Sequence, residues 1–465
     1  MQSMHDASGA MTTIANANAL AHWDETIVHV LAHAAAAPAA LTATLQADPA
    51  FVLGHAVKGL MILTLARSEM LDDARGQLML ARRLDRAAPV SVRERCYITA
   101  LEHWLARRPD LAAQALDSAI RTDRHDVLAA KLAHAIRFMM GDLHGMLQAA
   151  GEHVDLHGLK GPHSGYLVGC LAFSHEENGH YEQAERLGRH ALEMSPRDAW
   201  ARHSVAHVME MTGRAQEGVR WLEQGRVHSA HCNNFGFHLA WHEALFNLEL
   251  GNTSAALDLY DHDIRARKTD DYRDIANAAS LLQRLEFAGI HVGHRWHELA
   301  DLASHRVTDR ALVFADLHYA LALMGAGRDG DAEHIHLALS HDTSSGHDGQ
   351  LARRIGAPVA AAIRAFRTKH FAEAARLLLS ARPLLQRIGG SHAQRDIFEQ
   401  LLIESAIRSG DTTLAERLLE QRLAARGGQN SYAAQRLGKM AQAKRKPALR
   451  LATALVAMAP SPATH

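Results

Sequence analysis

Two imidazoles and a carboxylate lie close together in one short stretch of this 465-residue chain. His203, His207 and Glu210 are spaced by four and three residues, which places their side chains on one face of a helix. Two histidines and a carboxylate form a ligand set that proteins use for Zn²⁺, Fe²⁺, Co²⁺ or Mn²⁺. The spacing therefore predicts a divalent transition-metal site, whose ion would activate water or dioxygen or polarise a carbonyl of a small-molecule substrate.

A second histidine pair with the same spacing follows about 35 residues later, at His238 and His242. Since successive helical units place equivalent faces side by side, we expect the two pairs to share one site. The predicted metal ligands and catalytic residues are His203, His207, Glu210, His238 and His242. A histidine beside the ion would serve as general base near neutral pH.

Histidine is common in this chain, with 34 residues, and pairs at spacing four also occur at His29/His33 and His153/His157. The pairs are therefore compatible with a bound metal, with a polar groove for an organic ligand or peptide, and with structural histidines that are hydrogen-bonded in the core. Several histidines on one surface would also titrate together near pH ~6, as in a pH-responsive binder. The reaction type cannot be read from these residues.

The composition favours an elongated helical array. The length exceeds what one core normally supports, and apolar residues make up 48% of the chain but aromatic residues only 5%. A net charge of −1 offers no field for nucleic acid or an anionic membrane, and no segment approaches ~20 consecutive apolar residues. The first basic residue is Lys58, and the three cysteines are far apart, so we expect a cytoplasmic protein; its oligomeric state stays open.

Small residues recur with a period of 34 residues between positions 164 and 251. The aligned pairs are Gly179/Gly213, Ala172/Ala206, Ala184/Gly218 and Ala191/Gly225. Such a period is typical of stacked helix-turn-helix units, which bury their apolar faces only against neighbouring units. The chain is predicted to be all-α, a right-handed superhelix of such repeats over residues 19–426, between a flexible N-terminus (1–18) and a basic tail (427–465).

Tyr181, Ala184, Ala191 and Pro196 stand at the spacing of tetratricopeptide repeats. More closely, residues 23–426 resemble the tetratricopeptide repeat protein 38 family, through the segments 198–211, 237–245, 259–261 and 389–396. The resemblance implies an all-helical superhelix but no activity or cofactor. Because tetratricopeptide arrays bind partners with their inner helices, it also implies the alternative function of a non-enzymatic adaptor that holds a partner peptide in its concave groove.

Counted as in such repeats, the five predicted ligands all take groove positions on two inner helices. Glu176, Trp241 and His318 take groove positions as well and are predicted to bind the substrate. Ser391 and Gln394 read as a capping box at a helix start, where free N–H groups favour an anion. His392 and Arg395 are therefore also predicted to contact the substrate.

Overall fold

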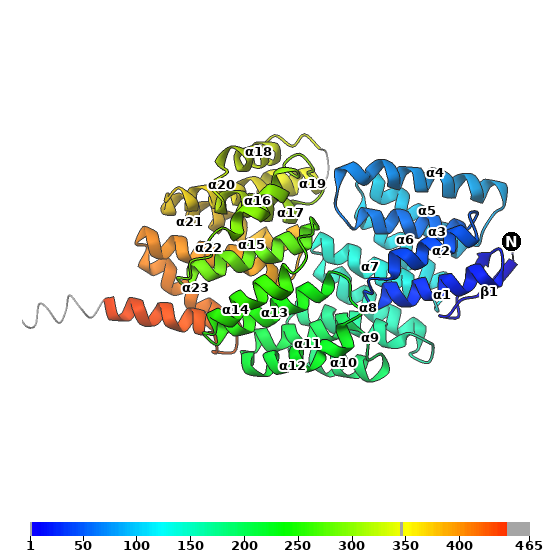
Figure 1. Ribbon diagram of the computed structural model, residues 1–465, viewed down its shortest axis with the longest axis horizontal. Helices are drawn as coiled ribbons and strands as arrows, with labels where there is room; N and C mark the ends of the chain where they lie inside the picture. The colour runs from blue at the N-terminus through cyan, green and yellow to red at the C-terminus, as the bar shows by residue number, and fades with distance from the viewer. Residues whose placement is uncertain (1, 345–346, 444–465) are drawn as a thin grey trace, which may run out of the picture.

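The computed structural model describes residues 2–344 and 347–443, and most of them are helical (Figure 1). The first helices are α1 Ala17–Leu31, α2 Ala37–Ala47, α3 Val52–Leu63, α4 Leu71–Ala87, α5 Val92–Leu105, α6 Pro109–Thr122, α7 Val127–Met140, α8 Leu143–His157, α9 Ser164–Glu177, α10 Tyr181–Met194 and α11 Ala199–Met211. They are followed by α12 Ala215–Ser229, α13 Phe235–Glu249, α14 Thr253–Leu259, α15 Tyr272–Phe287, α16 Arg295–Ser304, α17 Val313–Gly325, α18 Asp329–Ser340, α19 His347–Leu351, α20 Ala357–Arg367, α21 Phe371–Ala381, α22 His392–Ser409 and α23 Thr412–Ala425. Short 3₁₀ or π segments are η1 Ser68–Met70, η2 Tyr260–Ile264, η3 Ala352–Gly356 and η4 Arg382–Ile388.

Successive helices pair into hairpins, and each hairpin stacks on the next, which confirms the predicted all-α fold class. The turns within hairpins rely on glycine, because Gly179, Gly213 and Gly251 have φ values of 81°, 72° and 80°, in the left-handed region. Other small residues permit close helix packing: a Cβ atom added to Gly218 would lie 2.4 Å from the ring of Phe246. In the described part of the chain, no helix combines the length and apolar character that crossing a lipid bilayer requires.

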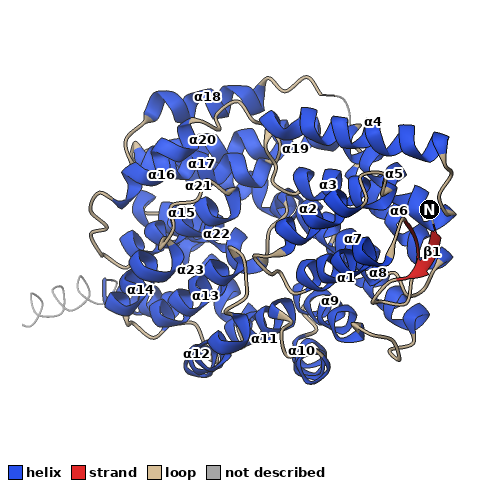
Figure 2. Cartoon of the chain, turned by 45° about the vertical axis from the view of Figure 1, so that its right-hand side comes forward, coloured by secondary structure: helices blue, strands red, loops and turns tan. Residues whose placement is uncertain are grey.

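The array curves back on itself, so that its first hairpin meets its middle (Figures 1 and 2). The loop after α1 pairs with the loop before α13 through an isolated bridge between Ala34 and Cys232 and through the bond from Asn233 N to His33 O, 2.8 Å long. At another point, the hydroxyl of Ser68 donates to Asp309, 2.6 Å away. Residues about 200 or more positions apart in sequence are therefore in direct contact.

Helix α22 lies against the inner helices α9 and α15. Its first turn receives hydrogen bonds at the carbonyl of Ala393 from Arg284 (2.7 Å), and Gln394 donates to Asn277 (3.1 Å). The backbone N–H of His392 donates to Glu177 at the end of α9 (2.8 Å). The first turn of α22 thus enters the concave side, which is expected to be an open groove.

The N-terminal segment differs from the expectation of a flexible stretch without regular structure. Strands β1 Gln2–His5 and β2 Met11–Ile14 form an antiparallel hairpin with Gln2 opposite Ile14, at the right-hand edge in Figure 2. The hairpin is fixed because Asp6 accepts bonds from its own turn, while Thr13 donates to Glu94 of α5 through its N–H and hydroxyl, both 2.8 Å. Long-range anchoring to α5 orders a segment whose local sequence shows no pattern.

The C-terminal segment, predicted as a basic tail, begins as a helix over residues 431–443 that packs on the array. Ala433 is fully buried, the N–H of Ser431 is bonded to Glu249, and the guanidinium of Arg436 lies over the ring of Tyr432. The rest of the predicted tail, 444–465, lies outside the described residues.

Candidate metal centre

Two neighbouring inner helices, α11 and α13, carry the histidine pairs. Helix α11 begins at a strong cap, since Asp198 accepts bonds from the N–H groups of Trp200 (3.0 Å) and Ala201 (3.2 Å). Because side chains four residues apart stack on one helical face, each helix turns both of its histidines toward the other helix.

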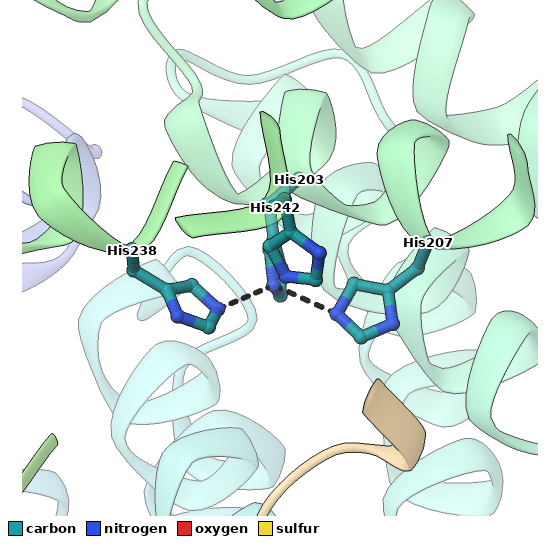
Figure 3. A group of neighbouring side chains, drawn as sticks. All are labelled: His203, His207, His238 and His242. Atoms are coloured by element: carbon teal, nitrogen blue, oxygen red, sulfur yellow. Dashed lines mark hydrogen bonds between the residues drawn. The ribbon is translucent and has the colours of Figure 1, made fainter. Parts of the chain in front are cut away.

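The four imidazoles converge in the interior (Figure 3). Nε2 of His203 lies 2.9 Å from Nε2 of His207 and 2.8 Å from Nε2 of His238. With His242, the group offers four nitrogen atoms within 4.8 Å of one another. All four side chains are buried, and Nε2 of His242 has no hydrogen-bond partner in the described residues.

These distances are close to those of a metal centre. Metal–imidazole bonds of about 2.0–2.1 Å in a tetrahedron would separate the nitrogen atoms by roughly 3.3 Å. The two short separations of 2.8 and 2.9 Å would have to open by a few tenths of an ångström, and the wider ones, which reach up to 4.8 Å, would have to close. Imidazole nitrogen suits Zn, Cu, Fe and Ni, so the donor set fits a divalent transition metal.

Behind the rings stand polar groups that would orient them. A carboxylate oxygen of Glu176 lies 3.5 Å from Nδ1 of His207, and one of Glu210 lies 3.5 Å from Nδ1 of His242. The side-chain amide of Asn277 lies 3.0 Å from Nδ1 of His238. Metal-bound histidines commonly have an acceptor on their second nitrogen, which takes its N–H, fixes the ring and strengthens it as a ligand. The two carboxylates fit this role, whereas Asn277 would fit it only with its amide oxygen, instead of the amide nitrogen, facing Nδ1.

Two predicted roles change with this geometry. Glu210, predicted to be a ligand, is not among the converging atoms; it contacts His242 from behind and also Arg426, at 3.4 Å. The reason is its position one turn beyond His207, which carries it past the centre toward the end of α11. Glu176, predicted to contact the substrate, lies fully buried behind His207 instead.

Burial determines the protonation of the rings. Burial first, and the neighbouring imidazoles second, hold the pKa of His203 and of His207 well below the usual value. Burial and then His242 do the same to the pKa of His238. These rings are therefore neutral near pH ~7, the form in which imidazole binds a metal.

The pKa values of the two carboxyl groups behind the rings, Glu176 and Glu210, are shifted in opposite directions. Burial, together with the neighbouring Glu177 and Glu210, raises the pKa of Glu176 well above its usual value. Burial also acts to raise the pKa of Glu210, but the contact with His242 and the charge of Arg426 outweigh it, and that pKa is lowered. Both oxygen atoms of Glu176 lack a hydrogen-bond partner in the described residues.

The remaining predicted substrate residues lie elsewhere. Trp241 is fully buried, and its ring stacks on His238 at a centroid distance of 5.4 Å, so it packs against the cluster. His318 bonds through Nδ1 to the carbonyl of Phe314 (2.7 Å), and burial lowers its pKa to about 4. It lies outside the four-histidine group.

His392 and Arg395 do stand at a helix start, and the Ser391–Gln394 capping box is present. Both side chains are turned to Glu177, however: Nε2 of His392 contacts its carbonyl (2.9 Å), and Arg395 donates to its carboxylate (3.1 Å). These bonds hold α22 to α9, and a contact of either residue with a substrate stays a prediction.

A cavity of about 230 Å³ adjoins the cluster, and His203 and His238 form part of its wall. Its other walls are mainly aromatic or apolar and include Phe138, Trp200, Phe235, Tyr272 and Phe314, with Lys131 of α7 among them. Sequence reasoning missed Lys131, Asn277 and Phe235 as site residues. Lys131 and Asn277 lie on α7 and α15, and no spacing connects them to the histidine pairs, whereas Phe235 lies on α13, three residues before His238.

No family model matches the chain. Among solved structures it is similar to a chain of one described as "Structure of Naa15/Naa10 bound to HypK-THB", with 12% sequence identity and a TM-score of 0.24. The alignment covers 88% of this chain and 63% of the other, so this chain spans less than two thirds of the protein that it matches. A likeness at this level shows no family, partner or activity.

Proposed function

We propose that His203, His207, His238 and His242 bind a divalent transition-metal ion and that this centre acts on a small molecule in the adjoining cavity. The observation that carries the proposal is the convergence of buried imidazole nitrogens: Nε2 of His203 lies within 2.9 Å of two other Nε2 atoms, and Nε2 of His242 has no partner in the described residues. One neutral ring nitrogen can satisfy one neighbour by hydrogen bonding, whereas an ion in the middle would satisfy all four.

The charges around the cluster also support a cation. Glu176 is fully buried with both oxygen atoms unpartnered in the described residues, and such a group is costly without a positive charge nearby. An ion on Nε2 of His207 would leave the proton on Nδ1, which could then donate to Glu176. Glu210 would support His242 in the same way, at its present distance of 3.5 Å.

Four protein ligands would fill a tetrahedral ion, which is the arrangement of a structural zinc site. An ion that prefers six ligands, such as Fe²⁺, Co²⁺ or Mn²⁺, would keep positions for a substrate. Because His203 and His238 border the cavity, a substrate would reach the ion from that side. An ion with only neutral ligands keeps its full charge and would act as a Lewis acid on a substrate oxygen atom.

The alternative, an adaptor that holds a peptide in the concave groove, is less well supported. α22 occupies much of the inner side, where its first residues bond to α9 and α15. Membership of the tetratricopeptide repeat protein 38 family also remains a proposal, supported by the sequence segments quoted above. The expected reducing, cytoplasmic environment is supported by three free cysteines, Cys96, Cys170 and Cys232.

Metal analysis of protein purified without a metal-affinity tag tests the proposal. We expect about one equivalent of a transition metal, a lower melting temperature after treatment with a chelator, and loss of the metal in His203→Asn. His318→Asn is the matched control, because His318 is equally buried on an inner helix but lies outside the cluster. A metal-free protein that takes up neither Zn²⁺, Fe²⁺, Co²⁺ nor Mn²⁺, and whose melting is unaffected by chelator, would refute the metal centre.

A further inference from the structure

The cavity beside the histidine cluster holds a buried cation with no partner. Lys131 of α7 is only 6% exposed, and its Nζ has no hydrogen-bond partner in the described part of the chain. Its nearest aromatic support is Trp200, with Nζ 5.0 Å from the centroid of the ring. A buried ammonium without a direct hydrogen bond is costly, so its position in the wall of a cavity points to a site for an anion.

The other charged groups in the wall are already paired. Arg273 forms an ion pair with Asp271 at 2.6 Å. Asp274, the single carboxylate among the described wall residues, accepts bonds from Thr269 and from Asn234. Lys131, in contrast, has no hydrogen-bond partner for its Nζ among the described residues.

Asp198 lies near enough to Lys131 for the two charges to interact: burial raises the pKa of the Asp198 carboxyl to about 6, and the charge of Lys131 opposes that rise. The two groups nevertheless form no direct hydrogen bond in the described residues. Oδ1 of Asp198 caps α11, and its Oδ2 is buried without a hydrogen-bond partner in the described residues. The ammonium group therefore keeps its hydrogen-bonding capacity for a ligand that enters the cavity.

We infer that the cavity binds a small organic anion, whose carboxylate pairs with Lys131 and whose planar or apolar part packs against Trp200 and Phe235. The volume of about 230 Å³ suits a molecule of this size, and aromatic walls favour a flat body. This inference rests on the proposed function for the chemistry at His203 and His238. The pairing with Lys131 does not itself require a metal.

Calorimetric titration of chelator-treated protein tests the pairing apart from the metal. The probes are benzoate and its neutral analogue benzamide, which have nearly the same shape. We expect the wild type to bind benzoate at least tenfold more tightly than benzamide. Lys131→Met should abolish this preference, and Lys131→Arg should retain most of it.

A control variant and a measurement of thermal stability complete the test. Lys58→Met is the control, because Lys58 lies on α3 outside the cavity wall, and it should behave like the wild type. Without ligand, Lys131→Met should melt at or above the wild-type temperature, because it removes an unpaired buried charge. Absence of benzoate binding, equal affinity of the wild type for both probes, or an unchanged preference in Lys131→Met would overturn the inference.

The outcomes for the two proposals are separable. A metal-binding protein without a Lys131-dependent preference for benzoate would retain the metal centre and lose the anion site. A protein that binds benzoate through Lys131 but takes up no metal would retain the anion site alone.

Discussion

Replacing Glu176 by glutamine tests whether the carboxylate of Glu176 supports a bound cation. Glu176 is fully buried, and neither of its oxygen atoms has a hydrogen-bond partner in the described residues. The substitution keeps the size of the side chain and removes only its ability to become charged. We therefore expect the free energy of unfolding of metal-free protein to change by less than about 1 kcal/mol, or to increase.

Metal affinity, unlike the stability of the metal-free protein, should fall in this variant. Glu176 lies 3.5 Å from Nδ1 of His207, where it would hold the ring and its tautomer. Loss of such a supporting group typically lowers metal affinity by about 10- to 100-fold, which equals roughly 1.4–2.7 kcal/mol. The variant should thus keep its fold and lose affinity.

The assay is a competition titration with Zn²⁺ or Co²⁺ against a chromogenic chelator, combined with thermal melting of the metal-free protein. Glu177→Gln is the matched control, because Glu177 is bonded to Arg395 (3.1 Å) and to the N–H of His392 (2.8 Å). Breaking this buried pair should cost about 3–5 kcal/mol with or without metal. Wild-type affinity in Glu176→Gln, or a loss of metal-free stability as large as that of the control, would refute the assigned role.

Further predictions concern stability. Burial raises the pKa of Asp316 to about 8, so the folded state holds a proton that the unfolded chain releases above pH ~4. The free energy of unfolding should therefore fall as the pH rises toward 8. Asp316→Asn should flatten this fall in denaturation curves measured between pH ~5 and ~8. Gly218→Ala should lower the free energy of unfolding by about 1–3 kcal/mol, because its Cβ would lie 2.4 Å from the ring of Phe246. Gly76→Ala, with open space around it in α4, should instead raise it by about 0.5–1 kcal/mol in urea denaturation; equal effects of the two alanines would contradict the packing described. Deletion of residues 2–14 should lower the melting temperature, because it removes the bonds from Thr13 to Glu94; an unchanged melting curve would show that the hairpin is dispensable.

Much of the fold follows from local pattern. The glycines of the hairpin turns and the small residues at close helix contacts recur with the repeat, so one period identifies both. The same period places the two histidine pairs on neighbouring inner helices, and the structure brings His203, His207, His238 and His242 together. Spacing along a helix is a reliable guide when both partners come from adjacent units.

Interactions between distant segments could not be predicted in this way. Glu210 has the spacing of a ligand, yet its side chain ends behind His242, because a helical wheel gives the face of a residue but not its depth. His392 and Arg395 meet Glu177 only because α22 folds into the interior. Lys131 of α7 belongs to the cavity because α7 and α11 both pack on α9, which brings Lys131 over the ring of Trp200.

The contact between the loop after α1 and the loop before α13 joins the first hairpin of this array to its middle. Open solenoids gain or lose whole units readily, since each unit touches only its neighbours. Here an inserted or deleted hairpin between Ala34 and Cys232 would break the contact between these two loops and shift both walls of the cavity. The number of units in this stretch is therefore fixed by geometry, and evolutionary variation in length should concentrate in the outer loops.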